Sequence, residues 1–203
     1  MYNPDLMWEI EHAVRQKGYS RIAGIDEAGR GPLAGPVVSA AVILPADFFC
    51  PGITDSKKLS EKKRRHFFPR IMSGALAVGV GVCNHKEIDQ INILQASLLS
   101  MKRAVDNLDP APDFLLVDGQ FPVSMDICQQ AVVKGDTRSI SIAAASIIAK
   151  VTRDRIMITL DQVFPAYGFI RHKGYPTAAH RQAILDHGPC PAHRRTFTGV
   201  AHP

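Results

Sequence analysis

The sequence predicts one α/β domain with a central mixed β-sheet and helices around it, and three observations support this fold class. The chain has 203 residues, of which 46% are hydrophobic and 21% are charged, so it can bury the core of a single domain. Short segments rich in β-branched residues alternate with longer segments of helical spacing. No repeat or low-complexity segment interrupts them. We expect residues 1–203 to form one domain, with a basic helical segment from about residue 165 to 203.

The N-terminal part predicts a helix followed by two strands. Residues 5–17 carry apolar side chains three and four positions apart, and Gly18 follows as a stop signal. Residues 21–25 form a short apolar run that ends at Asp26, as a strand would. Residues 36–44 are almost continuously apolar and β-branched, which is typical of a strand that is buried on both faces.

The next segment predicts a basic helix and a third strand. Ser60 can cap a helix that runs towards Met72, although Pro69 should end or kink that helix near Phe68. Residues 75–83 have the composition of a strand, but two glycines weaken this prediction. Strands separated by a helix continue the alternation expected of an α/β domain.

The second half of the chain predicts three helices and two strands. Residues 85–108 carry apolar side chains at helical spacing, and two prolines close the segment. Residues 114–117 and 131–133 are short apolar runs, each followed by a turn that contains an aspartate. Residues 139–164 lack Gly and Pro and give the strongest helix prediction in the chain. Residues 177–187 predict a last short helix.

The sequence shows no membrane segment and no secretion signal. The longest uncharged apolar stretches, residues 31–46 and 71–85, are shorter than the roughly 20 residues that a spanning helix needs, and Gly or Pro interrupts both. The first ten residues carry acidic side chains where a signal peptide would carry basic ones. We therefore expect an intracellular, cytoplasmic protein that does not bind a membrane.

The cysteines do not form a recognisable site. They are widely spaced and contain no CxxC pair, which argues against a zinc ribbon and a thioredoxin-type redox site. A chain of this length also needs no disulfide framework. We interpret all of them as ordinary thiols: Cys50, Cys83, Cys128 and Cys190.

Positive charge is concentrated in two segments. The formal net charge is +5, and residues 57–70 hold seven basic side chains against one acidic side chain. Residues 171–203 hold five basic side chains against one acidic one. Clustered Lys and Arg attract phosphates by releasing counterions, so a polyanionic partner such as nucleic acid is plausible. The alternative is that these segments are solvated surface.

Carboxylates follow three of the predicted strands, as Asp26–Glu27, Asp118 and Asp136. The carboxyl edge of a sheet is where such side chains can converge in a crevice. Four clustered carboxylates repel one another unless a cation compensates, and Mg²⁺ or Mn²⁺ prefers oxygen ligands of this kind. The pattern fits two-metal phosphodiester hydrolysis. Taken singly, an aspartate beside a glycine, as at Gly119 and Gly135, more often belongs to a simple turn.

The segment after Asp26–Glu27 has a formal alternative as a dinucleotide fingerprint. Gly29, Gly31 and Ala34 match G-x-G-x-x-A, and Asp47 lies about 20 residues further on. Pro32 and a β-branched run where a helix should open argue against this interpretation. The glycines more plausibly allow the backbone to approach a ligand closely, with amides free to contact a sugar or phosphate.

Two further segments carry polar groups. Residues 55–60 (DSKKLS) combine a turn, two lysines and a helix cap, which suits phosphate binding but also an ordinary capped surface helix. The histidines of the C-terminal region lack a tight metal spacing and need not be ligands: His172, His180, His187, His193 and His202.

Several motifs together resemble the ribonuclease HII family, the type 2 ribonucleases H. The match begins with GIDEAGRGPLAGPV at residues 24–37, which is more specific than any single motif above. It continues in order over nearly the whole chain, through DSKKL (55–59), VDG (117–119), KGD (134–136), AAASIIAKVTRD (143–154), YGF (167–169), HKGYPT (172–177) and HRRTF (193–197).

The resemblance implies an RNase H-like fold and a set of site residues. Asp26, Glu27 and Asp118 would be metal ligands and catalytic residues, with Asp136 as the fourth carboxylate and Asp154 as its rival. The backbone of residues 29–31 would read the ribose 2′-hydroxyl, and Tyr175 would pack on the deoxyribose that follows the ribonucleotide. We expect the substrate-binding set to be Gly29, Arg30, Gly31, Lys57, Lys58, Ser146, Lys150, Tyr175, Arg194 and Arg195. Our own hypothesis within this set is that Lys57, Lys58, Arg194 and Arg195 contact the nucleic-acid backbone.

The resemblance also implies the reaction. The chain would cleave RNA in RNA–DNA hybrids and cut 5′ to single ribonucleotides in duplex DNA, using two Mn²⁺ or Mg²⁺ ions and leaving 5′-phosphate and 3′-hydroxyl ends. Its role would be the removal of ribonucleotides from DNA. The motifs begin too early for the extra domain of ribonuclease HIII, and the tail shows no motif for a sliding clamp. We expect a monomer.

Two other function classes remain as alternatives. A non-catalytic nucleic-acid binder could keep the fold and the basic segments, but it would gain nothing from four clustered carboxylates. A dehydrogenase would require the dinucleotide fingerprint, which the sequence disfavours.

Overall fold

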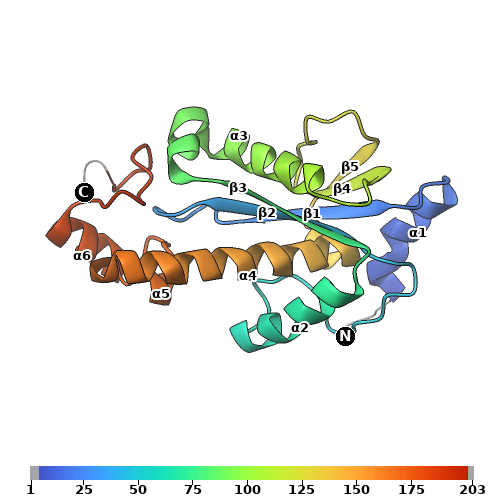
Figure 1. Ribbon diagram of the computed structural model, residues 1–203, viewed down its shortest axis with the longest axis horizontal. Helices are drawn as coiled ribbons and strands as arrows, with labels where there is room; N and C mark the ends of the chain where they lie inside the picture. Colours follow the sequence, from blue (N-terminus) through green and yellow to red (C-terminus); the bar gives the residue numbers. More distant parts are fainter. Residues whose placement is uncertain (1–4, 201–203) are drawn as a thin grey trace.

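The computed structural model describes residues 5–200 and shows a five-stranded sheet between helices (Figure 1). The strands are β1 (Ile22–Ala28), β2 (Val37–Ile43), β3 (Ala77–Cys83), β4 (Phe114–Asp118) and β5 (Gln129–Val132). The longer helices are α1 (Glu9–Gln16), α2 (Glu61–Gly74), α3 (His85–Asp106), α4 (Ile140–Val163) and α6 (Ala178–His187). Shorter helices are η1 (Asp5–Trp8), η2 (Gly135–Thr137), η3 (Pro165–Tyr167) and α5 (Phe169–His172).

The sheet is mixed, in the order β3-β2-β1-β4-β5. Strand β1 pairs antiparallel with β2, which pairs antiparallel with β3, whereas β1, β4 and β5 run parallel. The carboxyl ends of these three parallel strands therefore lie at the same edge. This arrangement confirms the α/β fold class, and the antiparallel return of β2 directly after β1 rules out the dinucleotide-binding topology.

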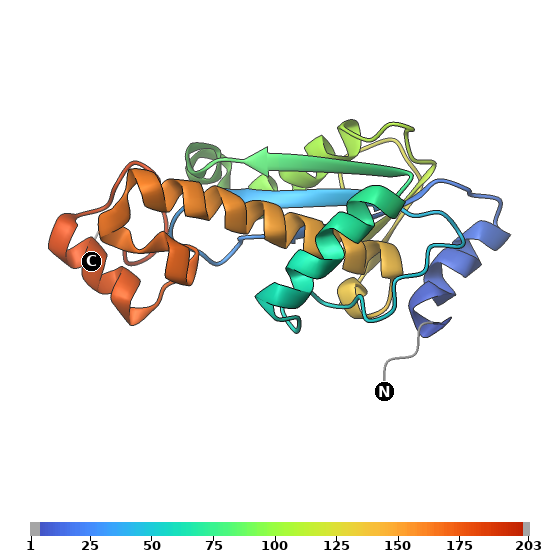
Figure 2. The ribbon, with the colours of Figure 1, turned by 60° about the horizontal axis from the view of Figure 1, so that its bottom comes forward.

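Helices cover both faces of the sheet. Helix α3 packs on one face, and α4 crosses the other face with α2 beside it (Figures 1 and 2). Strand β2 is buried along its whole length, as its continuous apolar sequence predicts. Two glycines of β3 allow α3 to approach closely, since a Cβ at Gly79 or Gly81 would lie 2.0 Å from a carbonyl oxygen of α3. The glycines that weakened the strand prediction are thus a packing requirement.

Helix α4 is the central helix of the molecule. A Cβ at Gly24 would lie 2.1 Å from the backbone of Ser141, so strand β1 touches the first turn of α4 directly. Ser139 caps this helix, and the buried carboxylate of Glu11 accepts hydrogen bonds from Ser139 and Ser141. The α1 carboxylate therefore complements the N-terminus of α4. The C-terminal end of α4 leads into η3, α5 and α6, which confirms the helical C-terminal region of the predicted fold class, although no helix follows His187 in the described residues.

Three element boundaries differ from the sequence predictions. Strand β1 does not end at Asp26 but continues to Ala28, because Glu27 and Ala28 still pair with β2. Helix α2 continues through Pro69, which is exposed, so water can bond the carbonyl that loses its partner while Phe67 and Ile71 hold the helix on the core. The predicted strand at 131–133 is β5, which begins and ends earlier.

The helix predicted at 85–108 contains a break. Asn92 has φ 66°, and its side chain accepts hydrogen bonds from the amides of Leu94 and Gln95, as an N-cap does. Asn84 caps the first part together with Glu87. The segment therefore consists of two helical pieces, each with its own N-cap. The apolar spacing continues across the break, so the sequence predicts a single helix.

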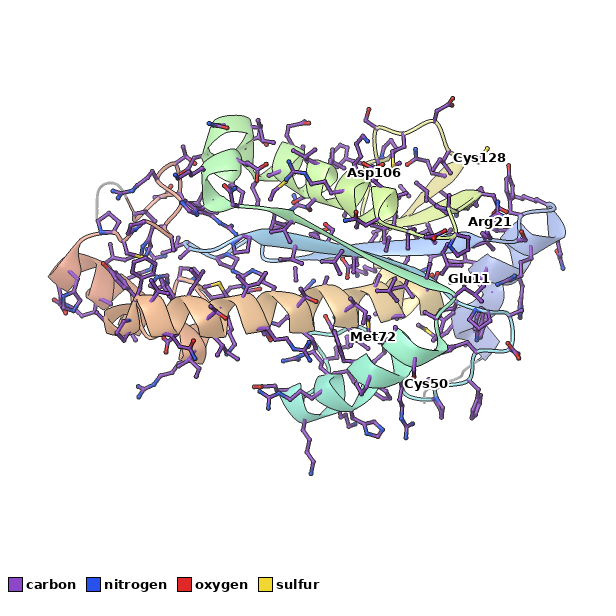
Figure 3. The ribbon with its side chains drawn as sticks, in the orientation of Figure 1. Glu11, Arg21, Cys50, Met72, Asp106 and Cys128 are labelled. Carbon is purple, nitrogen blue, oxygen red and sulfur yellow. The ribbon has the colours of Figure 1, made fainter. Side chains whose placement is uncertain are left out.

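The cysteines form no disulfide among the described residues. Cys50, Cys83 and Cys190 are buried, Cys128 is exposed, and all four are free thiols; Cys50 and Cys128 lie in different parts of the molecule (Figure 3). None of the described helices is long and apolar enough to cross a membrane. His202 and the end of the tail examined for a clamp motif lie outside the described residues.

Candidate active site

The predicted carboxylates of β1 and β4 lie side by side at the carboxyl edge of the parallel strands. Ile25 pairs with Val117, so the next residues along the two strands, Asp26 and Asp118, are neighbours. One oxygen of each carboxylate accepts a backbone hydrogen bond. The Glu27 amide donates to Asp26 Oδ1 at 2.6 Å, and the Gly135 amide donates to Asp118 Oδ1 at 2.7 Å. These bonds fix the orientation of both side chains.

Burial makes the negative charge at this edge unfavourable. Burial, and then the charges of Glu27 and Asp118, raise the pKa of Asp26 well above its ordinary value. Burial also raises the pKa of Glu27, with Asp118 contributing, although Arg30 opposes this from 3.7 Å. Desolvated carboxylates that repel one another are typical of a site that a cation completes.

Asp136 extends this cluster into an adjacent cavity of about 420 Å³. The cavity is lined by Asp55, Lys57, Lys58, Asp118, Lys134, Asp136 and Thr137. Burial, followed by the charges of Asp55 and Asp118, raises the pKa of Asp136 to about 6. The cavity therefore joins the carboxylates to the first lysines of the basic segment.

Lys57 supplies positive charge to the carboxylates. Partial burial acts against its charged form, but Asp26, Asp136, Asp55 and Glu27 outweigh that effect and raise the pKa of Lys57. The lysine thus stays charged and compensates part of the negative charge. Its position is set by the turn before α2, where the Lys57 amide donates to Asp55 Oδ1 at 2.8 Å.

The donor set fits hard divalent cations. Asp26, Glu27, Asp118 and Asp136 offer only carboxylate oxygens, which Mg²⁺ and Mn²⁺ prefer, and the raised pKa values of Asp26, Glu27 and Asp136 show that the charged forms lack compensation. Among residues 5–200, no three carboxylate, imidazole or thiol groups already converge on one position. The carboxylates are grouped at one edge of the sheet.

Asp154, the rival for the fourth carboxylate, lies in a different environment. Its oxygens pair with Lys150 at 2.7 Å and with Arg64 at 4.0 Å. It lines a separate cavity of about 310 Å³ between α2 and α4, together with Arg65 and Arg155. Because its charge is already compensated by cations, Asp154 is less suited than Asp136 to hold a metal ion.

The predicted 2′-hydroxyl reader, residues 29–31, forms a loop directly after β1. Arg30 and Gly31 are exposed, whereas Gly29 is buried with φ 104°. Tyr175 stands beside this loop, since a Cβ at Gly31 would lie 3.9 Å from its ring, and 38% of Tyr175 is exposed. The loop and the aromatic ring therefore form one surface next to the carboxylates.

Arg194 does not reach the surface, so the expected direct contact with a nucleic-acid backbone does not fit the structure. Its side chain is fully buried and donates to the carbonyl oxygens of Gly29, Arg30 and Gly35. The neighbouring Arg195 is exposed and can still meet a phosphate.

The other predicted contacts vary in accessibility. Lys58 is exposed at the mouth of the 420 Å³ cavity. Ser146 is buried, and its hydroxyl accepts a long hydrogen bond of 3.3 Å from the Ser56 amide, so it supports the turn before α2. The Lys150 ammonium lies 5.8 Å from the Tyr175 ring and pairs with Asp154. Lys58 can meet a substrate directly, whereas Ser146 acts through the backbone.

Sequence reasoning missed two residues of this region. Asp55 lines the same cavity as Asp136 and raises the pKa of Asp136, and the available signal was its place at the start of the DSKK motif. Arg153 is fully buried and donates to Ala34, Pro36 and Lys173. Its signal was weaker, a charged residue that follows the mostly apolar first half of α4.

Comparisons with known proteins agree with the motifs. Residues 23–200 match the family model described as ribonuclease HII. The chain is 59% identical over 194 residues to ribonuclease HII of Geobacter sulfurreducens, covering 96% of this chain and 89% of that protein. It is 57% identical to the Geobacter metallireducens enzyme, covering 96% and 91%. The ribonuclease H2 structure from Pyrococcus horikoshii OT3 superimposes with a TM-score of 0.74 at 28% identity, covering 89% and 95%.

Proposed function

The chain belongs to the ribonuclease HII family and is a ribonuclease H, and we propose that it cuts 5′ to single ribonucleotides in duplex DNA as well as within RNA–DNA hybrids. The observation that carries this proposal is the adjacency of the carboxylate edge to the loop of residues 29–31 and to Tyr175. A site that cuts phosphodiesters thus lies beside groups that can read a ribose and the sugar after it. The role would be ribonucleotide removal from DNA.

Enzymes of this family depend on divalent metal ions. We propose that Asp26, Glu27, Asp118 and Asp136 hold two Mg²⁺ or Mn²⁺ ions in this chain. When bound, the ions supply positive charge at the scissile phosphate and acidify water there. The desolvation and mutual repulsion of these carboxylates support the assignment, because both effects are relieved by a cation.

The protein side chains position the substrate around this centre. Lys57, held among four carboxylates, can donate to a phosphate oxygen. The Gly135 amide donates to Asp118 Oδ1 and so fixes the orientation of this carboxylate. The Oδ2 atom of Asp118 is left to face the space between the carboxylates. Attack of water on phosphorus and departure of the 3′ oxygen give 5′-phosphate and 3′-hydroxyl ends. The 2′-hydroxyl is recognised but does not attack, so no 2′,3′-cyclic phosphate forms.

All these groups come from one chain, so we propose that residues 1–203 act as one catalytic unit and as a monomer. Light scattering should give the mass of a single chain. A mass of two chains in the presence of substrate would contradict the monomer.

The proposed function is tested with an end-labelled DNA duplex that contains one ribonucleotide, incubated with Mg²⁺, Mn²⁺ or EDTA. We expect a metal-dependent cut on the 5′ side of the ribonucleotide. Cleavage of a long hybrid without this cut would leave only the general ribonuclease H activity. Tight duplex binding without cleavage of either substrate would favour a non-catalytic binder.

Replacing Lys58 by Ala should weaken binding of any duplex and flatten its salt dependence. The side chain is exposed beside the carboxylate cavity, and each phosphate contact contributes about one unit to the slope of log K against log salt. The measurement is fluorescence anisotropy at several salt concentrations in EDTA. Lys17→Ala, which removes an exposed lysine at the end of α1, is the matched control. An unchanged slope would remove Lys58 from the interface.

Replacing Tyr175 by Ala should reduce cutting at a single ribonucleotide by roughly tenfold or more, because it removes the ring that packs on the following deoxyribose. The comparable stacking of a base on an aromatic ring contributes about 1–3 kcal/mol. Cleavage inside a long hybrid should fall less, since many registers remain available there. Rates on both substrates give the ratio, and Tyr175→Phe, which keeps the ring, is the control. An equal loss on both substrates would contradict the junction-reading role.

A further inference from the structure

Two buried arginines lie beneath the loop of residues 29–36. Arg153 comes from α4 and Arg194 from the C-terminal segment, and both side chains are fully buried. Neither lies within ion-pair distance of a carboxylate among the described residues. Burying a charge without a counter-ion is costly, so their retention needs an explanation other than ion pairing.

Both guanidinium groups are bonded to backbone carbonyls. Arg194 donates to Gly29 at 2.6 Å and to Arg30 and Gly35 at 3.0 Å. Arg153 donates to Pro36 at 2.9 Å and to Ala34 at 3.1 Å. A third bond runs from Arg153 to Lys173, two residues before Tyr175. Five carbonyls of one short loop are thus turned inward, towards two cations.

The opposite side of the loop is left for a ligand. Among residues 5–200, no oxygen accepts a hydrogen bond from the amides of Arg30 and Gly31, and both residues are exposed. Amides that follow inward-facing carbonyls form a donor surface that suits an oxygen-rich ligand. The uncompensated charge of the two arginines behind the loop strengthens this preference.

The packing leaves the loop little freedom. A Cβ at Gly29 would lie 2.1 Å from Arg153 Nε, so this position accepts only glycine while the arginine is in place. The Gly35 amide donates to Ala192, and the Leu33 amide donates to Gly174. The arginines therefore join β1, α4 and the C-terminal segment around one loop conformation.

We propose that Arg153 and Arg194 are positioning residues that hold the amides of Arg30 and Gly31 towards the ribose 2′-hydroxyl, and so set the discrimination between RNA and DNA. This inference rests on the proposed function, because it concerns how the same site selects its substrate. Burial lowers the pKa of Arg153 to about 10 and that of Arg194 to about 9, so both remain charged at neutral pH.

Arginine is required at these positions because its planar fork serves three carbonyls at once. A lysine keeps the charge but presents a single point donor without the fork geometry. Arg194→Lys should therefore loosen the loop while the site keeps its charge. We expect the preference for a duplex with one ribonucleotide over the all-DNA duplex to fall at least about tenfold, which corresponds to about 1.4 kcal/mol.

The test is fluorescence anisotropy with these two duplexes of the same sequence, in EDTA so that nothing is cut. For Arg194→Lys and Arg153→Lys, affinity for the all-DNA duplex should stay within about twofold, because neither side chain is exposed. The control is Val14→Ala, which destabilises the α1 core far from the loop and should keep the full preference.

The outcomes separate this inference from the proposed function. If the wild-type protein prefers the ribonucleotide and both lysine variants keep that preference, the positioning role is wrong and the proposed function stands. Equal loss of affinity for both duplexes would indicate a general structural role and also overturn it. A wild-type protein without any preference would overturn both.

A measurement on the unaltered protein covers the case in which the variants do not fold. In a ¹⁵N-labelled sample, the amides of Arg30 and Gly31 should exchange rapidly with solvent. The ribonucleotide-containing duplex should slow this exchange at least about tenfold, and the all-DNA duplex should not. Amides that are already protected in the free protein, or that respond equally to both duplexes, would refute the proposal.

Discussion

Replacing Asp118 by Asn is expected to reduce the rate of cleavage at an embedded ribonucleotide by about a thousandfold or more, while the fold and duplex binding persist. Asp118 stands between Asp26 on β1 and Asp136 after β5, so it faces both halves of the carboxylate group. If the metal assignment is correct, losing this charge removes about 4 kcal/mol or more of transition-state stabilisation, which is a factor of about 10³.

The geometry explains why the fold should survive this change. The amide that replaces the Asp118 carboxylate keeps an oxygen that can accept the Gly135 N–H, now bonded to Asp118 Oδ1 at 2.7 Å. Removing a charge also relieves the repulsion that raises the pKa of Asp26, Glu27 and Asp136. Thermal unfolding without metal should therefore show the variant to be at least as stable as the wild type.

The measurement is single-turnover cleavage of the end-labelled duplex at saturating enzyme, with Mg²⁺ and separately with Mn²⁺. Asp106→Asn is the matched control, because Asp106 is exposed on α3 (Figure 3) and pairs with Lys102 there. Near-normal cleavage by the Asp118 variant would exclude it as a ligand. Loss of duplex binding at unchanged stability would instead assign it to substrate binding.

The elements that sequence alone predicts best are those whose pattern and packing agree. Helix α4 and strand β2 are long, uninterrupted and buried, so their boundaries are confirmed within one or two residues. Glycine motifs and strand-end carboxylates likewise predict where the site lies. In both cases the local position in the fold determines which residue type is suitable there, so the local sequence carries the information.

Two of the predictions that were wrong involve partners distant in sequence. Strand β1 continues past Asp26 because β2 returns to pair with Glu27, which no local pattern reports. Arg194 has the sequence context of a surface cation, but its partners are three carbonyls more than 150 residues earlier in the chain. Every residue has a backbone carbonyl, so no residue type marks the partners of a buried arginine that bonds only to carbonyls. The burial of Arg194 therefore cannot be predicted from the sequence.

The stability of the metal-free protein should fall as pH rises between about 4 and about 6, through a contribution from Asp136. Burial, Asp55 and Asp118 raise its folded-state pKa to about 6 from an ordinary value of 3.8. Within this window the folded state binds more protons than the unfolded state, so raising the pH favours unfolding. Below about pH 4 the contribution is fully present, and above about pH 6 it is lost.

Asp136→Asn isolates this contribution from those of other carboxylates. Glu87, Asp89 and Asp113 have lowered pKa values and act in the opposite direction at lower pH. The variant carries no titrating group at 136. Its free energy of unfolding should therefore exceed that of the wild type by an amount that grows from about pH 4 to about pH 6 and then stays constant. Allowing for solvent screening, we expect this stability difference to change by about 1–2 kcal/mol across the window, which corresponds to roughly 2–8 °C in Tm.

The difference in Tm between the two proteins, measured in EDTA from about pH 4 to about pH 8, checks this expectation. Adding Mg²⁺ or Mn²⁺ near neutral pH should then stabilise the wild type more than the Asp136 variant, since an ion that binds only the folded state raises stability according to its affinity. A difference that does not change with pH would show that Asp136 is not held in an unfavourable charged state. Equal stabilisation of both proteins by metal would remove Asp136 from the set of metal ligands.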